Sequence, residues 1–556
     1  MRNLSVVRVF RGGMAGSAVA VLAACGGRGD VTQPPPVSAE VSLGATEYAL
    51  LAGSQVSGRV RFPAAGAAGA QYLVVGQFAT GTSGVSAGFT MGSAEFSTQP
   101  ALLADRLADR VFQPADPRAR FHDALRRWDS ELVRAGRASG VRAAAAPPAP
   151  APPPTVGSQR TFKVCASLDA TGCATFDNVP ATASYVGLHA AIFVDDSAPA
   201  NGLGASDIAQ LGRQFDDVLY PIDSAAFGAE SDVDANGVVI VLLTKTVNAL
   251  VPKPECDESF IVGFFLGADI FPSTRTQFNN GEVFYGFLPE LSPPSTRCAR
   301  SPATVKALLP STFIHEFQHM ISFNQHVLIQ NGDTEVLWLN EALSHLAEEL
   351  GGLHYDSLSN TSAADQFLVG NLYDAFLYLK DPSANAVVTE SSTATLEERG
   401  GAWLFIRYVA DRFGASVLRR LVQTASTGAA NVVAATGTPL ATLLGRWALA
   451  VYATDLPGFT PPQALTYDFW RFRAEYAALD ISPRYGSFFD RPYPLVPSEQ
   501  TGTAFSVGGT MKSGSGAYVL VTQAADGAGF DLTFRASDGN ALPANAGAQL
   551  AVLRIR

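Results

Sequence analysis

Two histidines and a glutamate stand close together in the pattern His-Glu-x-x-His, at His315, Glu316 and His319. On an α-helix, positions i and i+4 lie on the same face, so the two imidazoles can point at one metal ion. Imidazole nitrogens at about 2.0–2.1 Å are typical zinc ligands. Glu316 projects about 100° around the helix from His315, so it can reach a water on the metal without binding the metal. The pattern predicts a zinc site with Glu316 as general base.

A second stretch offers a third ligand. Residues 338–352 read Trp-Leu-Asn-Glu-Ala-Leu-Ser-His-Leu-Ala-Glu-Glu-Leu-Gly-Gly, with apolar residues at helical spacing and a Gly-Gly pair that predicts the end of the helix. Glu341 lies in the first turn of this helix. If the two helices pack together, its carboxylate completes three protein ligands and leaves the fourth tetrahedral position for water, as in catalytic zinc sites.

The sequences of these two stretches resemble those of a known class of proteins. His-Glu-Phe-Gln-His-Met-Ile followed by Trp-Leu-Asn-Glu-Ala-Leu-Ser is similar to the gluzincin class of zinc metallopeptidases, and within it to the hyicolysin-type family of secreted bacterial enzymes. The resemblance covers residues 185–455 and implies an α+β catalytic domain that acts on a protein or peptide. It implies His315, His319 and Glu341 as zinc ligands and Glu316 as catalytic base.

One position departs from this resemblance. Thermolysin-like gluzincins have an aspartate four residues after the glutamate ligand, where it orients a ligand histidine, and this chain has His345 there. The orienting role then falls to Glu348 or Glu349, or is absent, and His345 is itself an alternative ligand because it shares a helix face with Glu341. Hydrolysis also needs a donor for the oxyanion. The sequence offers four unranked candidates: Tyr285, His354, Tyr355 and Tyr408.

The sequence predicts that the elements positioning this site form an α+β fold. They are a mixed sheet, two helices that carry the zinc ligands, and a helical subdomain at residues 360–455. Buried strands are predicted at residues 190–194 and 238–243. The strand at residues 281–288 is either an ordinary strand or, as the resemblance implies, an edge strand that pairs with extended substrate. The predicted domains are a signal peptide (1–24), a tether (25–40), a β-sandwich-like domain with a helical tail (41–142), an Ala/Pro linker (143–158), the catalytic domain (159–460) and a second β-rich accessory domain (461–556).

The first 25 residues predict export. Three arginines precede a short apolar run ending in Leu-Ala-Ala-Cys, which resembles a bacterial lipobox and implies cleavage before Cys25 and lipidation of its thiol. An ordinary signal peptide is the alternative. We predict a protein anchored by lipid to the membrane of the bacterial cell envelope, on the periplasmic side or the cell surface, or a secreted protein. The other cysteines are disulfide candidates in any of three pairings: Cys165, Cys173, Cys256 and Cys298.

A candidate calcium loop and the net charge of the chain bear on what the protein binds. Asp232, Asp234 and Asn236, followed by a glycine, resemble the start of a calcium loop, and an Asx-rich turn is the alternative. The net charge of −11 carries no basic footprint for nucleic acid, so no nucleic-acid partner is predicted. We expect a monomer.

Three functions remain open on these observations. The first is a zinc-dependent endopeptidase that hydrolyses proteins outside the cytoplasm. The second is a non-enzymatic surface lipoprotein, a binding module with a relic metal site, which predicts no chelator-sensitive proteolysis. The third is a zinc amidase that acts on cell-wall bonds. The Ala/Pro tract at residues 143–154 is also a candidate site for maturation by cleavage.

Overall fold

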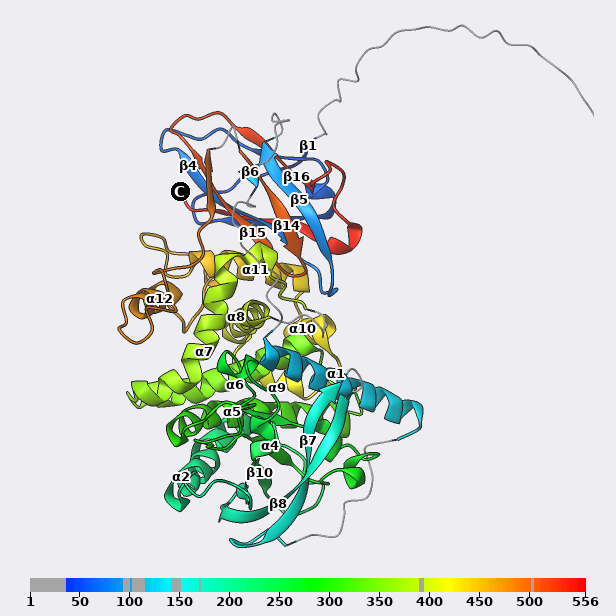
Figure 1. Ribbon diagram of the computed structural model, residues 1–556. Coiled ribbons are helices and arrows are strands. Elements are labelled where there is room, and N and C mark those ends of the chain that lie inside the picture. Colours follow the sequence, from blue (N-terminus) through cyan, green and yellow to red (C-terminus); the bar gives the residue numbers. More distant parts are fainter. Residues whose placement is uncertain are drawn as a thin grey trace, which may run out of the picture. The chain divides into compact units, whose positions relative to one another are not determined.

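The computed structural model describes residues 37–93, 101–102, 116–141, 152–169, 172–389, 395–501 and 505–556. The predicted signal peptide, the lipidation site Cys25, most of the tether and most of the Ala/Pro linker lie outside these residues. The described chain is α+β, with three β-sheets and twelve α-helices (Figure 1). None of the helices in this described part is long and apolar enough to cross a lipid bilayer.

The sheet that leads into the metal motif is mixed and six-stranded, in the order β11-β12-β10-β9-β8-β7. Its strands are β7 (Gln159–Asp169), β8 (Gly172–Val186), β9 (Ala190–Asp195), β10 (Val239–Leu243), β11 (Gly263–Phe265) and β12 (Val283–Gly286). The two predicted buried strands are confirmed as β9 and β10, which pair in parallel, and every residue of β10 is buried. Short apolar runs of this kind are typical of strands covered on both faces.

Of the two alternatives for residues 281–288, the ordinary strand is confirmed and the edge strand is wrong. β12 lies between β10 and β11, so β11 forms that edge of the sheet. The apolar pattern of a strand reports burial on its two faces, but it does not report which neighbours its backbone pairs with.

The motif helix is α5 (Pro302–Phe323), and the helix that carries Glu341 is α6 (Leu337–Ser357). The hydroxyl of Ser301 accepts a hydrogen bond from Thr304 N at 3.1 Å, and Pro302 occupies the first turn, so the start of α5 is capped. α5 packs against β11 and against α6. This contact brings the two predicted zinc helices side by side.

The predicted helix end at the Gly-Gly pair is wrong, because α6 continues through it to Ser357. A Cβ on Gly352 would lie 2.5 Å from the side chain of Leu368, on α7 (Thr361–Lys380). Because Gly351 and Gly352 have no side chains, α7 can approach α6 closely. Glycine in a helix can therefore allow close packing as well as mark a helix end.

The helical region predicted at residues 360–455 is confirmed. α8 ends at Phe413, where Gly414 takes a φ of +76°. The remaining helices are α1 (Pro117–Ala138), α2 (Ala205–Gln214), α3 (Tyr220–Ala226), α4 (Lys245–Asn248), α8 (Leu396–Phe413), α9 (Ser416–Val422), α10 (Gly428–Thr436), α11 (Leu440–Ala453) and α12 (Phe472–Asp480).

Helix α1 belongs with the sheet of the metal motif, although we predicted it as the tail of an N-terminal domain. Arg126 donates a hydrogen bond to Phe265 O at 2.6 Å, and Gly267 N donates to Asp129 at 3.1 Å. These two bonds attach α1 to strand β11 and to the turn that follows it. The helix itself was predictable from its sequence, but its place in the fold depends on contacts with residues that lie far along the chain.

The two β-rich ends of the chain form one sandwich rather than two separate domains. The sheet orders are β1-β3-β16-β5-β14-β6 and β13-β15-β4-β17-β2, and Figure 1 shows blue N-terminal strands among orange and red C-terminal ones. The strands are β1 (Val37–Glu40), β2 (Tyr48–Ala52), β3 (Arg59–Phe62), β4 (Ala70–Phe78), β5 (Ser86–Ser93), β6 (Ala101–Leu102), β13 (Ser498–Thr501), β14 (Ser506–Lys512), β15 (Gly516–Gln523), β16 (Phe530–Ala536) and β17 (Ala548–Arg554).

Deleting residues 505–556 should leave the protein insoluble. β4 would lose both neighbours, β15 and β17, and β5 would lose β14 and β16, so their buried faces and backbone groups would be exposed together. The measurement is soluble yield, compared with that of a chain that lacks only residues 1–36 and keeps every described strand. A soluble, protease-resistant N-terminal domain in the truncated protein would show that the two ends fold separately.

The cysteines form two disulfides. Cys165 pairs with Cys173 between strands β7 and β8, and Cys256 pairs with Cys298. Of the three pairings that the sequence allowed, the structure has the one that joins cysteines adjacent in the chain.

The predicted calcium residues form a turn. Asp232 accepts hydrogen bonds from the backbone N–H groups of Asn236 and Gly237, and Asn236 accepts one from Val238 N. Oδ1 of Asp232 and Oδ1 of Asn236 are therefore occupied by local backbone groups. Asp234 accepts a hydrogen bond from the side-chain amide of Asn236, its other oxygen has no hydrogen-bond partner, and it lies near Asp232 and Glu282. The contacts fit the Asx-rich turn.

Candidate metal centre

The structure brings together the three predicted zinc ligands. The Nε2 atoms of His315 and His319 are 3.2 Å apart, and the carboxylate of Glu341 lies 3.7 Å from the first and 3.6 Å from the second. Two ligands at about 2.05 Å from one tetrahedral ion are about 3.3 Å apart. All three side chains are buried, and Oε1 of Glu341 has no hydrogen-bond partner. The spacing and the unpartnered oxygen fit a zinc ion.

Both histidines are held by their other ring nitrogen. Nδ1 of His315 lies 2.6 Å from the carboxylate of Glu348, and Nδ1 of His319 lies 3.0 Å from the side-chain oxygen of Asn340. Donating Nδ1–H to these oxygens leaves each Nε2 with a free lone pair directed at the metal position. Glu348 therefore fills the orienting role for which the sequence offered two candidates. The other candidate, Glu349, instead accepts hydrogen bonds from the indoles of Trp403 and Trp470.

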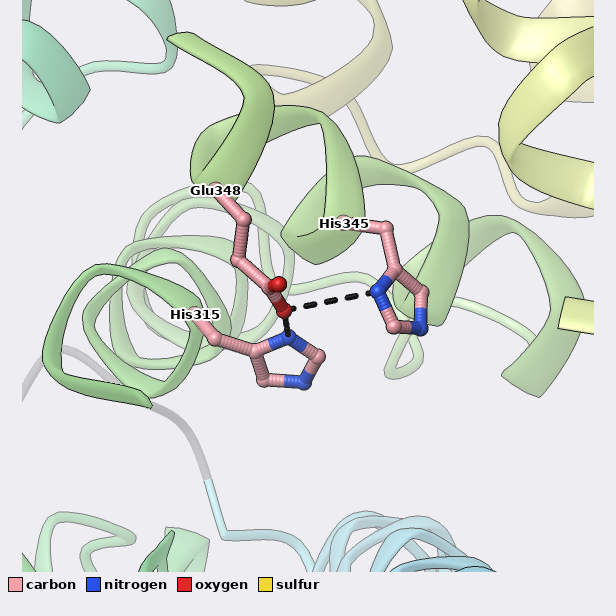
Figure 2. Close-up of side chains that lie close together, drawn as sticks. All are labelled: His315, His345 and Glu348. Atoms are coloured by element: carbon pink, nitrogen blue, oxygen red, sulfur yellow. Dashed lines mark hydrogen bonds and ion pairs between the residues drawn. The ribbon is translucent and has the colours of Figure 1, made fainter. Parts of the chain in front are cut away.

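His345 lies beside this support and outside the set of three ligands. Its Nδ1 is 2.8 Å from Asn371 Oδ1 and 3.4 Å from the carboxylate of Glu348, and Figure 2 shows that carboxylate between the two imidazole rings. The 2.6 Å contact of Glu348 with His315 is a hydrogen bond and is too short for two ligands of one ion. This trio is therefore a support for His315 rather than a second metal site. Nε2 of His345 is buried and has no hydrogen-bond partner.

The buried charges of the site shift the pKa values of one another. Burial by itself lowers the pKa of His315, but its hydrogen bond with Glu348 and the nearby carboxylates raise the net pKa above its ordinary value. Burial would raise the pKa of Glu348, but hydrogen bonds from His315 and His345 hold it at about 2. Burial lowers the pKa of His319 well below its usual value. The lowered pKa of His319 favours the neutral imidazole, which is the form that binds a metal.

Glu316 is buried next to the metal position. One carboxylate oxygen accepts a hydrogen bond from Phe265 N at 2.9 Å, and the other lies 3.5 Å from Nδ1 of His122. Burial raises the pKa of Glu316 to about 7, although His315 and Arg126 oppose the rise. A carboxylate whose pKa is close to the working pH is well suited to accept and return a proton.

Glu341 is tied to helix α1 through an arginine. Arg399 Nη1 donates to Glu341 Oε2, and Arg399 Nη2 donates to Asp123 on α1 at 3.1 Å. Burial would raise the pKa of Glu341, but Arg399, His319 and His315 together hold it well below its usual range. Burial raises the pKa of Asp123 to about 7 against the attraction of Arg399.

Sequence reasoning missed His122, Asp123 and Arg399. They belong to no motif, and they reach the site only because α8 packs against α6 and α1 is hydrogen-bonded to β11. The one available signal was that α1 carries charged residues on most of its turns, so part of any buried face had to be charged.

A cleft of about 360 Å³ opens beside the metal position. Its walls include His315, Glu316, His345 and Glu348, together with His122 of α1 and Arg399. The predicted oxyanion donors do not line it. The hydroxyl groups of three of them bind elsewhere: Tyr285 donates to Asp269, Tyr408 donates to Ala464 O, and Tyr355 accepts from Gln214.

Comparison with known proteins finds a sequence relative for part of the chain. No protein-family model matches the chain. A stretch of 175 residues, 31% of this chain, is 29% identical to the neutral metalloprotease ShpI of Staphylococcus hyicus. The match spans 36% of that protein's length.

Two solved structures also align with the chain. An M1 zinc metallopeptidase from Deinococcus radiodurans aligns at 14% identity over 55% of this chain and 49% of its own. A two-domain M1 zinc metallopeptidase variant bound to L-arginine aligns at 13% identity over 52% of this chain and 48% of its own. Both have a TM-score of 0.23, so neither supports an argument about this fold.

Proposed function

We propose that this protein is a zinc-dependent endopeptidase that hydrolyses peptide bonds of proteins outside the cytoplasm. The observation that carries the proposal is the convergence of His315, His319 and Glu341 within 3.2–3.7 Å of one another, beside the buried carboxylate of Glu316. The partial similarity to a neutral metalloprotease supports the same chemistry. The predicted export signal supports the location, with a lipid anchor at Cys25 as the proposed attachment.

The mechanism assigns a distinct role to each side chain. A zinc ion held by the three ligands would polarise the scissile carbonyl and lower the pKa of water. Glu316 takes the proton from the attacking water and returns it to the leaving amine, as its raised pKa allows. The N–H of Phe265 fixes one oxygen of Glu316, so the other oxygen is the one that handles the proton. Glu348 and Asn340 keep the two imidazoles oriented throughout the cycle.

Hydrolysis of casein should require the metal. The purified protein is expected to contain zinc and to cleave casein and internal bonds of end-blocked peptides. A chelator should abolish this cleavage, because it removes the cation that activates the attacking water. Added zinc should restore the cleavage. The measurement is zinc content together with the rate of fluorescent casein cleavage.

Two other results would replace the proposal. Zinc binding without cleavage of casein, peptides or cell-wall fragments would indicate a binding module with a relic metal site. Chelator-sensitive release of cell-wall fragments, with casein left intact, would indicate an amidase.

A further inference from the structure

A chain of charges connects helix α1 to the metal ligand Glu341. Asp123 on α1 accepts from Arg399 on α8, and Arg399 donates to Glu341 on α6. All three side chains are buried, with exposed fractions of 5%, 7% and 1%. Buried charges are expected to be paired, and here each of the two carboxylates pairs with the same guanidinium.

This bridge fixes the orientation of the ligand. Arg399 holds Oε2 of Glu341, while Oε1 is left without a hydrogen-bond partner and lies 3.6 Å from Nε2 of His319. The oxygen free to bind zinc is therefore the one nearest His319, while Oε2, which Arg399 holds, is the one nearest His315 at 3.7 Å. The guanidinium is always protonated, so it also places a permanent positive charge next to the site of a divalent cation.

Asp123 is placed to offset that charge. A positive charge close to a divalent cation in a buried site weakens metal binding, and a carboxylate on the far side of the guanidinium reduces this repulsion. Asp123 is held in position because the bonds from Arg126 to Phe265 and from Gly267 to Asp129 fix α1 on the edge of the sheet. The cleft remains open with α1 in this place and has His122 in its wall.

We propose that Asp123 and Arg399 are positioning residues for the metal ligand Glu341, and that helix α1 is thereby a working part of the metal centre. The inference rests on the proposed zinc site but not on the choice of substrate. It assigns a role in metal binding to a segment of the chain that precedes the metal motif by almost 200 residues.

The chain contains a matched control for this bridge. Arg407, also on α8, donates to Glu349 of α6 at 3.3 Å and to Asp411 at 2.6 Å, which repeats the Asp–Arg–Glu arrangement. Glu349 is not a metal ligand, since it bonds to two indoles. Asp411→Asn therefore removes the same chemical group from a second, partly buried Asp–Arg–Glu bridge without touching the metal position.

The test is zinc affinity, measured by competition with a chromophoric chelator at about pH 8, where carboxylates are ionised. Asp123→Asn is expected to weaken zinc binding by about tenfold, the lower end of the usual effect of losing an outer partner of a metal ligand, because Asp123 acts on Glu341 through Arg399. Asp411→Asn should change it by less than about threefold. The midpoint temperature of thermal unfolding, measured on the metal-free proteins, reports the structural cost alone. It should fall by similar amounts in both variants.

A double-mutant cycle tests whether Asp123 acts through the arginine. In an Arg399→Gln background, Asp123→Asn should change zinc affinity by less than about threefold, because the charge that it offsets has gone. Three results would each overturn the proposal. They are unchanged zinc affinity in Asp123→Asn, an equal loss of zinc affinity in Asp411→Asn, and a full effect of Asp123→Asn in the Arg399→Gln background. Faster casein cleavage by Asp123→Asn at unchanged zinc affinity would show instead that α1 obstructs the cleft. If zinc affinity behaves as expected but no peptide is cleaved, this inference stands and the proposed function fails.

Discussion

Glu316→Gln is expected to lower peptide hydrolysis by about 10²–10⁴-fold, the usual contribution of a positioned general base. The amide keeps the size of the side chain and can still accept the hydrogen bond from Phe265 N, but it cannot take a proton from water. Zinc content should not change, because Glu316 is not among the three converging ligands. The measurement is kcat on an end-blocked peptide together with zinc content.

Glu335→Gln provides the control for this experiment. Glu335 is also buried, and burial also raises its pKa to about 7, but it accepts hydrogen bonds from Gly428 N and Asn431. Its amide variant should cleave the peptide within a few-fold of the unmodified rate. Cleavage by Glu316→Gln at the unmodified rate would show that another group accepts the proton.

Glu341→Ala should abolish zinc retention, whereas His345→Ala should keep it. The carboxylate of Glu341 lies within 3.7 Å of both ligand imidazoles, while Nδ1 of His345 contacts only the outer groups Asn371 and Glu348. Loss of a ligand should weaken zinc binding by more than about 100-fold, beyond the 10–100-fold typical of an outer partner. The measurement is zinc content after dialysis against a weak chelator.

The pair of variants separates two ligand sets. If His345→Ala loses zinc and Glu341→Ala keeps it, the third ligand is the histidine. Loss in both variants, with the metal-free proteins still folded, would mean that zinc binding also needs His345, either as a ligand or through its contact with Glu348, which holds His315.

The parts of the fold that the sequence predicted are those encoded locally. The helix around His315 and His319, the apolar strand predicted at residues 238–243 and the helices within residues 360–455 each carry their pattern within one short segment. A period of 3.6 or a run of buried β-branched residues needs no knowledge of the rest of the chain.

The parts that were missed depend on distant partners. Nothing in β4 shows that its neighbours are β15 and β17, and nothing in α1 shows that it packs on β11. The Gly351-Gly352 pair has the composition of a helix end, but α7 makes it a close contact.

The candidate site divides in the same way. Two ligands and the base follow from one motif, and the third ligand follows from a helix pattern nearby. The choice of Glu348 over Glu349 turned on side-chain directions across two packed helices, which spacing alone left undecided. Arg399 and Asp123 were invisible because a buried ion pair between distant helices leaves no periodic trace in the sequence.

The shared sandwich also constrains how the polypeptide is made. Because β4 and β5 pair with β14, β15, β16 and β17, which lie far along the chain, their ladders close only after those later strands have been synthesised. Contacts of such high sequence separation slow folding and leave early strands without partners during synthesis. Strands β4 and β5 are therefore expected to depend on holding factors until residues 505–556 have been made, and the region between the two sets of strands is best regarded as an insertion within a host sandwich.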